Sequence, residues 1–100
     1  MGITLISATR IANNKLASLK NEIGTDLQII EDATIEKDLY WVFFYNSKSY
    51  LEEGNLSDQL AGNSPLIIDK IHGNIYETGT AKSVEFYMEE FEQTKLPLLK

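Results

Sequence analysis

His72 is the one imidazole of the chain and the first residue to consider for chemistry. Asp69 precedes it by three residues, so the two could act as a general base and its partner, or begin a metal site. A lone histidine in a Gly-Asn turn has no second nitrogen ligand and no nucleophile next to it in the sequence. We therefore interpret His72 as a turn residue. A site built from Asp69, His72 and a carboxylate remains the enzymatic alternative.

Adjacent carboxylates are the other groups that could perform acid–base chemistry. They occur as three pairs, Glu31-Asp32, Glu52-Glu53 and Glu89-Glu90. Neighbouring side chains along a strand point to opposite faces, so Glu31 and Asp32 cannot readily form a dyad. Glu52 and Glu53 lie near Asp58, and we interpret these three residues as an exposed acidic patch.

Two further classes of site are excluded by residue type. The chain contains no cysteine, which excludes disulfides, thiolate zinc sites and a cysteine nucleophile. Gly62-Asn63-Ser64-Pro65 lacks the lysine of a Walker motif and precedes a predicted strand instead of a helix. We therefore predict no catalytic residues, no metal ligands and no cofactor.

The net charge of −6 is unevenly distributed. Residues 1–21 carry +3, residues 22–60 carry −7 and residues 61–100 carry −2. The acidic middle disfavours nucleic acid, whose phosphates require a positive groove. It favours a basic protein partner, although acidic surfaces often serve only solubility.

The apolar spacing predicts a helix at each end of a single domain. Apolar residues recur every three or four positions between Leu5 and Ile23, with Thr4 as N-cap and Gly24 after the last turn. A second helix begins after Ser83. We predict one domain over residues 1–94 and a loosely held tail over residues 95–100.

Residues 39–45 read as a strand that is apolar on both faces, which is typical of an interior strand. It is predicted to form one hairpin with residues 27–36, and a second hairpin is predicted from residues 66–69 and 75–78. A short helix is expected after Ser57. The predicted fold class is α+β, a four-stranded antiparallel sheet with the N-terminal and C-terminal helices packed on one face. The segment 46–64, a partner or a second subunit would then cover the other face.

These pieces occur in an order that resembles the immunity protein 35 (YrhB-like) family. The segments that carry the resemblance are Trp41–Tyr45, Tyr50–Gly54, Leu60–Lys70, Gly73–Ile75 and Gly79–Ala81, followed by the helix with Glu85, Tyr87, Met88 and Phe91. The similarity covers about residues 39–92. Family members resemble small cytoplasmic proteins encoded beside bacterial polymorphic toxins, and papain-like peptidases are among those toxins. The resemblance thus implies an immunity protein that binds and occludes a cognate toxin and is not an enzyme.

The expected partner is therefore a cognate toxin protein, with no nucleic acid and no membrane involved. No targeting segment or membrane span is visible, so we expect a cytoplasmic protein. A homodimer would be one way to cover the aromatic strand, and a small chaperone-like protein for exposed apolar segments is the alternative function. The predicted partner-binding residues are Glu31, Asp32, Glu52, Glu53 and Asp58.

Overall fold

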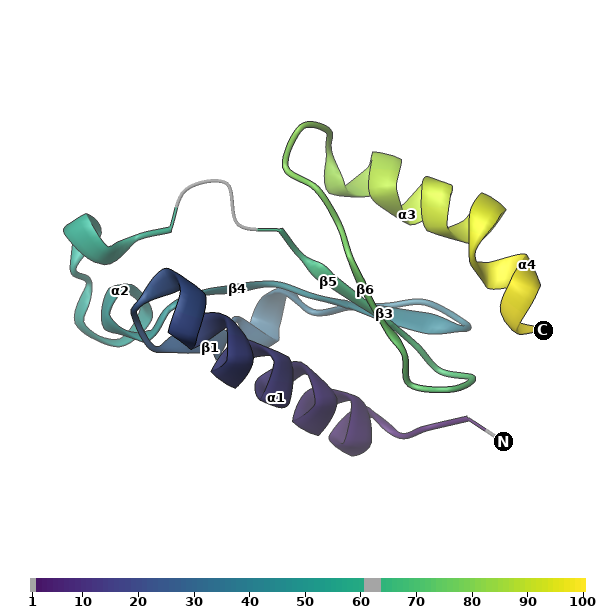
Figure 1. Cartoon of the computed structure of the whole chain (residues 1–100), viewed down its shortest axis with the longest axis horizontal. Helices are drawn as coiled ribbons and strands as arrows, with labels where there is room; N and C mark the ends of the chain where they lie inside the picture. Colours follow the sequence, from purple (N-terminus) through teal and green to yellow (C-terminus); the bar gives the residue numbers. More distant parts are fainter. Residues whose placement is uncertain (1, 61–63) are drawn as a thin grey trace.

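The computed structural model describes residues 2–60 and 64–100 of the chain. Helices flank the strands at both ends of the sequence, and three short helical elements lie between the strands (Figure 1). The elements in chain order are α1 (Leu5–Ile23), β1 (Leu27–Ile29), the 3-10 helix η1 (Glu31–Ala33), β2 (Ile35–Glu36), β3 (Tyr40–Phe43), β4 (Tyr45–Ser47), α2 (Lys48–Glu53), the 3-10 helix η2 (Leu56–Asp58), β5 (Leu66–Asp69), β6 (Ile75–Glu77), α3 (Val84–Thr94) and α4 (Leu96–Leu99).

The main sheet is antiparallel and has the strand order β2-β3-β5-β6. Strand β3 is therefore interior, as the sequence predicts, and it pairs with β5 from Tyr40 opposite Asp69 to Phe43 opposite Leu66. The hairpin β5–β6 is also confirmed. The predicted α+β class with four antiparallel strands and a helix at each end is thus the fold of this chain.

The first predicted hairpin is present but divided between two sheets. Strand β2 pairs with β3, whereas β1 pairs with β4 in a separate two-stranded sheet. The 3-10 turn η1 separates β1 from β2, and Phe44 separates β3 from β4. A single backbone bond, from Ile30 N–H to Phe44 O over 2.8 Å, continues the pairing between the two sheets. The small sheet extends beyond the main sheet toward α2 (Figure 1).

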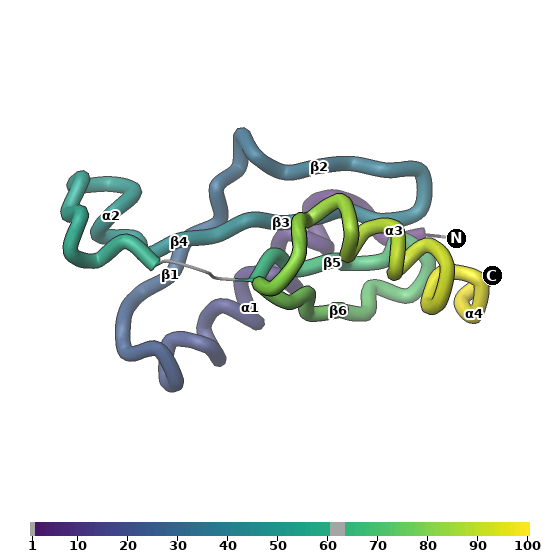
Figure 2. Tube along the Cα trace, turned by 90° about the horizontal axis from the view of Figure 1, so that it is seen from above, coloured from purple at the N-terminus to yellow at the C-terminus, as the bar shows by residue number. Residues whose placement is uncertain are grey.

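The two terminal helices lie on opposite faces of the sheet, which corrects the expectation that both pack on one face. Helix α1 packs through Ala8, Ala12 and Leu16 on one face, in a cluster with Trp41 and Phe43. The other face is covered by α3 and α4. Its cluster contains the buried residues Tyr40, Val42, Ile67, Met88, Phe91 and Leu96. Figures 1 and 2 show the resulting order of layers, α1, sheet and α3.

Alternation along β3 explains this arrangement. Successive strand residues point to opposite faces, and all four residues of β3 are buried. Each apolar face therefore needs its own cover, and each amphipathic helix supplies one. The chain itself covers the aromatic strand, without a partner or a second subunit.

The segment expected to cover the second face forms the far end of the molecule instead. Its main element is α2, which the sequence prediction missed and which starts after the N-cap Ser47 and ends at Gly54 with φ 72°. The helix expected after Ser57 is the shorter η2, which includes Ser57 within it. Residues 59 and 60 are not helical, so this helix ends at Asp58, and residues 61–63, with the turn expected at Gly62-Asn63, lie outside the described part of the chain.

The last six residues include the short helix α4, in which Leu96 is buried against Tyr40 and its neighbours. Leu98, by contrast, is 81% exposed. Leu99, at the end of α4, is partly buried and packs against the same cluster. The looser attachment of the tail, and the domain boundary at residue 94, stay predictions.

Candidate partner-binding surface

Asp69 is a structural residue of the β5–β6 turn. Its carboxylate is fully buried and accepts backbone N–H bonds from His72, from Gly73 at 3.2 Å and from Asn74 at 2.9 Å. A carboxylate that accepts three backbone donors stabilises a turn and has little capacity left to activate a substrate or orient an imidazole.

The β5–β6 turn requires glycine at position 73. Its φ is 77°, a region that favours glycine, and a Cβ there would lie 3.2 Å from methyl groups of both Ile3 and Ile11. The adjacent His72 is exposed. The structure therefore does not form the catalytic site of Asp69, His72 and a carboxylate that the enzymatic alternative requires. Within residues 2–60 and 64–100, no three histidine or carboxylate side chains gather as a metal site.

The acidic residues chosen from the sequence lie around the small β1–β4 sheet. Helix α2 contacts β1, β4 and η2, which joins these short elements into one end of the molecule. Figure 1 shows α2 at this end, beyond the main sheet. Glu31 and Asp32 are in η1, Glu52 and Glu53 are in α2, and Asp58 is in η2. All five side chains are exposed.

Two buried polar side chains of β4 position these acidic elements. The side chain of Ser47 caps α2 by accepting the Tyr50 N–H at 3.0 Å. The side chain of Asn46 accepts the Leu60 N–H at 2.8 Å, beyond η2. Because Ser47 is fully buried and Asn46 is 8% exposed, both anchors are part of the fold and not of the surface.

The structure divides the predicted acidic residues into separate groups. Glu31 and Asp32 line a hollow that also includes Leu51, whereas Glu52 and Glu53 border a second hollow beside Thr25 and Lys48. Asp58 lines neither of the two. The predicted surface is thus one acidic end with two distinct faces and not a single patch.

The charge on this end is only partly neutralised. Asp26 pairs with Lys20 at 2.7 Å, and the lysine, chiefly by its hydrogen bond and then by its charge, lowers the pKa of Asp26 below its ordinary value. Glu53 accepts a bond from the Asn55 amide at 3.1 Å. Within the part of the chain that the structure describes, none of the five predicted binding residues, Glu31, Asp32, Glu52, Glu53 and Asp58, has an ion-pair partner.

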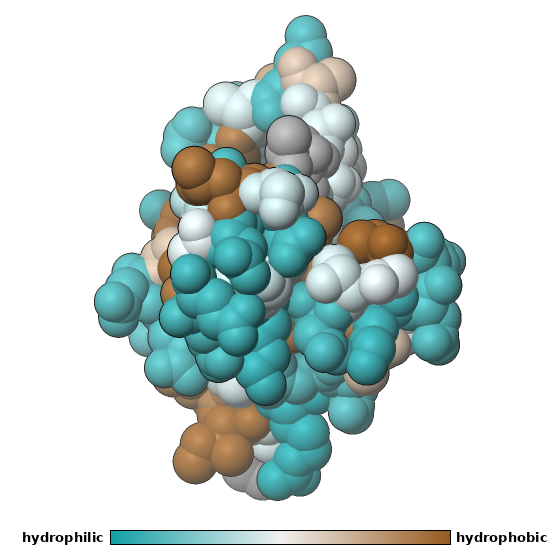
Figure 3. Space-filling view, turned by 90° about the vertical axis from the view of Figure 1, so that its left-hand side faces the viewer, coloured by the Kyte–Doolittle hydropathy of each residue, from teal (hydrophilic) through white to brown (hydrophobic). Residues whose placement is uncertain are grey.

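Figure 3 views the molecule from the end at which α2 lies. The surface there is mostly hydrophilic, and its hydrophobic spots are separated from one another. Leu56 in η2 is 74% exposed at this end. This composition, polar with scattered apolar residues, is compatible with a reversible protein interface.

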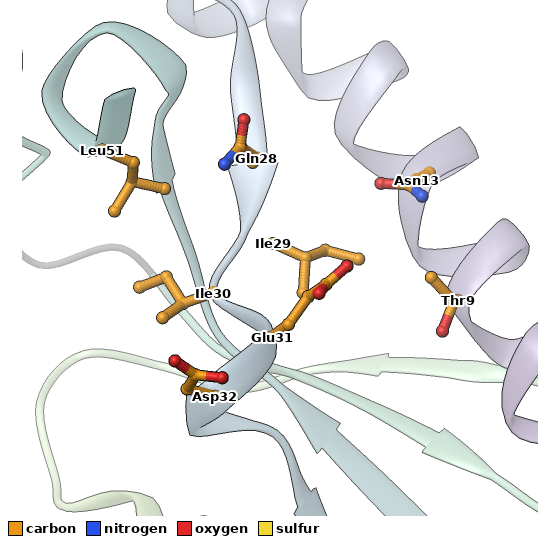
Figure 4. Close-up of a pocket in the computed structure, with 8 residues that line it drawn as sticks. All are labelled: Thr9, Asn13, Gln28, Ile29, Ile30, Glu31, Asp32 and Leu51. Atoms are coloured by element: carbon orange, nitrogen blue, oxygen red, sulfur yellow. The ribbon is translucent and has the colours of Figure 1, made fainter. Parts of the chain in front are cut away.

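The hollow beside η1 contains residues that sequence reasoning missed. Its volume is about 530 Å³, and its lining residues are Thr9, Asn13, Gln28, Ile29, Ile30, Glu31, Asp32 and Leu51. Figure 4 shows Ile30, Asp32 and Leu51 on one side of the backbone that joins β1 to η1, with Glu31, Asn13 and Thr9 on the other. The two carboxylates therefore diverge, as expected for adjacent residues. The other lining residues come from α1, β1 and α2, and only the tertiary structure brings them together.

A comparison with protein-family models decides the family. The model described as "Immunity protein 35" matches residues 6–94. The chain belongs to this family. The family name supports an immunity role in general.

A curated relative of this immunity protein is "Uncharacterized protein YrhB" from Escherichia coli strain K12, which is 44% identical over 55 residues. The matched segment covers 55% of the chain and 58% of the length of YrhB. No solved structure matches the chain. Among the helices of residues 2–60 and 64–100, none has the length and apolar character to cross a membrane.

Proposed function

We propose that this immunity protein neutralises one cognate toxin domain by binding it and occluding its active surface, without any catalytic step. The toxin class we propose is a papain-like peptidase, which the family resemblance implies. The observation that carries the proposal is the acidic end, where five exposed carboxylates lack an ion-pair partner in the described structure.

The charges favour a basic toxin surface. Residues 22–60 carry −7, and the structure collects most of this charge around the β1–β4 sheet and α2. Exposed charges that complement a partner mainly increase the association rate, because they steer diffusion over about a Debye length. The proposed binding residues are Glu31, Asp32, Glu52, Glu53 and Asp58.

The chaperone-like alternative loses its basis in the structure. It required the aromatic strand to offer apolar surface to clients, but Tyr40, Trp41, Val42 and Phe43 are each at most 3% exposed. The large apolar side chains that are exposed, such as Ile6, lie in α1, η2, α3 and α4 and not in this strand. We therefore propose a single function.

Survival of cells that co-express the neighbouring toxin tests this function. Replacing Glu52, Glu53 and Asp58 with lysine should weaken protection at limiting expression of the immunity protein. The matched control replaces Glu85, Glu89 and Glu90 of α3, which are also exposed, and should protect like the unchanged protein. Lost protection in both triple variants, with both proteins folded, would reject the acidic end as the specific interface.

A separate variant tests the absence of catalysis. His72→Ala should protect fully, because His72 is exposed and the Asp69 carboxylate is occupied by backbone donors. Loss of protection by folded His72→Ala would support the enzymatic alternative.

A further inference from the structure

The hollow between α1, η1 and α2 has two kinds of wall. Ile30 and Leu51 are half-buried and supply aliphatic surface on the side where Asp32 lies (Figure 4). On the α1 side, the exposed Glu31 carboxylate faces the same space as Asn13. An apolar wall beside an outward carboxylate suits a ligand group that is aliphatic along its stem and cationic at its tip.

The size of the hollow fits such a group. About 530 Å³ lies within the range of protein pockets that hold small organic groups, so it admits a whole extended side chain. Glu31 and Asp32 have no ion pair within residues 2–60 and 64–100. Because the two carboxylates diverge, the one available to a cation on the side of Ile30 and Leu51 is that of Asp32. Guanidinium groups are weakly hydrated and carry several donors, which favours pairing with a carboxylate that lies beside apolar surface.

We propose that this hollow is a receptor for a basic side chain of the toxin. The aliphatic stem would pack on Ile30 and Leu51, and the cationic head group would meet Asp32. Glu31 and Asn13 provide further acceptors on the α1 side of the same hollow. This inference rests on the proposed function for the identity of the partner. Binding of a basic side chain in the hollow can nevertheless be measured on this protein without the toxin.

Titration by nuclear magnetic resonance tests the receptor without the toxin. The probe is N-acetyl-arginine amide at low salt, and the matched control is N-acetyl-citrulline amide, which has a similar shape and no charge. We expect saturable shifts of the backbone amides of Gln28, Glu31, Asp32 and Leu51 with the arginine probe. The citrulline probe should bind at least about threefold more weakly, since it lacks the charge-assisted bonds.

Two double variants complete the test. Glu31→Gln with Asp32→Asn should weaken the arginine probe by at least about threefold, the loss expected when an exposed ion pair with Asp32 is removed. Glu89→Gln with Glu90→Gln on α3 removes the same charge from another adjacent pair and should leave the affinity unchanged. Equal weakening in both variants, equal binding of citrulline, or shifts centred on α3 would overturn the receptor proposal. Toxin protection that persists despite such a result would leave the proposed function standing.

Discussion

Asn46 holds the backbone of Leu60, 14 residues away, through a bond of 2.8 Å from the Leu60 N–H to Asn46 Oδ1. The same oxygen accepts the Ser47 N–H at 2.8 Å. One buried amide thus fixes both ends of the segment that contains α2 and η2. This contact ties the end of the segment back to β4 and so helps the acidic end to keep its shape.

Replacing this amide should loosen the acidic end. Asn46→Ala leaves two backbone donors without their acceptor, which should lower the free energy of unfolding by about 1–3 kcal/mol. Amide exchange in residues 48–60 should accelerate more than exchange in β3. The matched control is Asn55→Ala, whose amide bonds are exposed and whose loss should cost less than about 0.5 kcal/mol. Equal costs for the two changes would contradict the anchoring role.

Core and surface positions should separate clearly in urea unfolding. Val42 is fully buried under α3, so Val42→Ala should cost about 1–4 kcal/mol. Glu52→Gln removes an exposed charge and should change stability by no more than about 0.5 kcal/mol. A large loss of stability in the Glu52 variant would show that this carboxylate supports the fold and is not free for a partner.

Part of the stability should disappear at alkaline pH because of Tyr40. Burial raises the pKa of Tyr40 above its ordinary value of about 10, and the hydrogen bond to Glu92 and its charge add to the shift. A raised pKa in the folded state gives stability that is complete below the ordinary value and is lost as pH rises above it. Unfolding free energies at pH 8 and 11 should therefore fall more steeply for the unchanged protein than for Tyr40→Phe. Parallel losses would contradict this assignment.

Residues 95–100 should open before the rest of the domain. Helix α4 is held by the buried Leu96 and the partly buried Leu99, but Leu98 is 81% exposed and Pro97 has no backbone N–H to donate. We predict that amides of residues 98–100 exchange at least about tenfold faster than those near Phe91 in α3, because a frayed terminus opens locally. Protection equal to that of α3 would place the tail within the cooperative domain.

The sequence was most informative where a local pattern determines the structure. Thr4 and Gly24 bound α1 as predicted, because capping geometry is a local property. The two apolar faces of residues 39–45 predicted an interior strand, which is confirmed for Tyr40–Phe43, whereas Tyr45 belongs to β4 of the small sheet. The same alternation also implied that each face of the sheet is covered by a separate element. The error was to place both terminal helices on the same face.

Tertiary contacts account for what the sequence did not reveal. Helix α2 is only six residues long and depends on Ser47, a buried cap with no distinctive pattern around it. Asn46 meets Leu60 only after the chain folds back. The candidate hollow likewise combines Asn13 with Leu51, residues from separate elements that no spacing rule connects. The charge distribution along the sequence indicated one acidic region, but it could not predict that these residues lie on two faces of the acidic end.

Stopped-flow association with the cognate toxin domain, at two salt concentrations, tests the central claim most directly. Lysine substitutions at Glu52, Glu53 and Asp58 should slow association by at least about tenfold at low salt and flatten its salt dependence. The same substitutions at Glu85, Glu89 and Glu90 should leave both quantities close to those of the unchanged protein. Equal association rates for the two triple variants would contradict an electrostatic toxin interface at the acidic end.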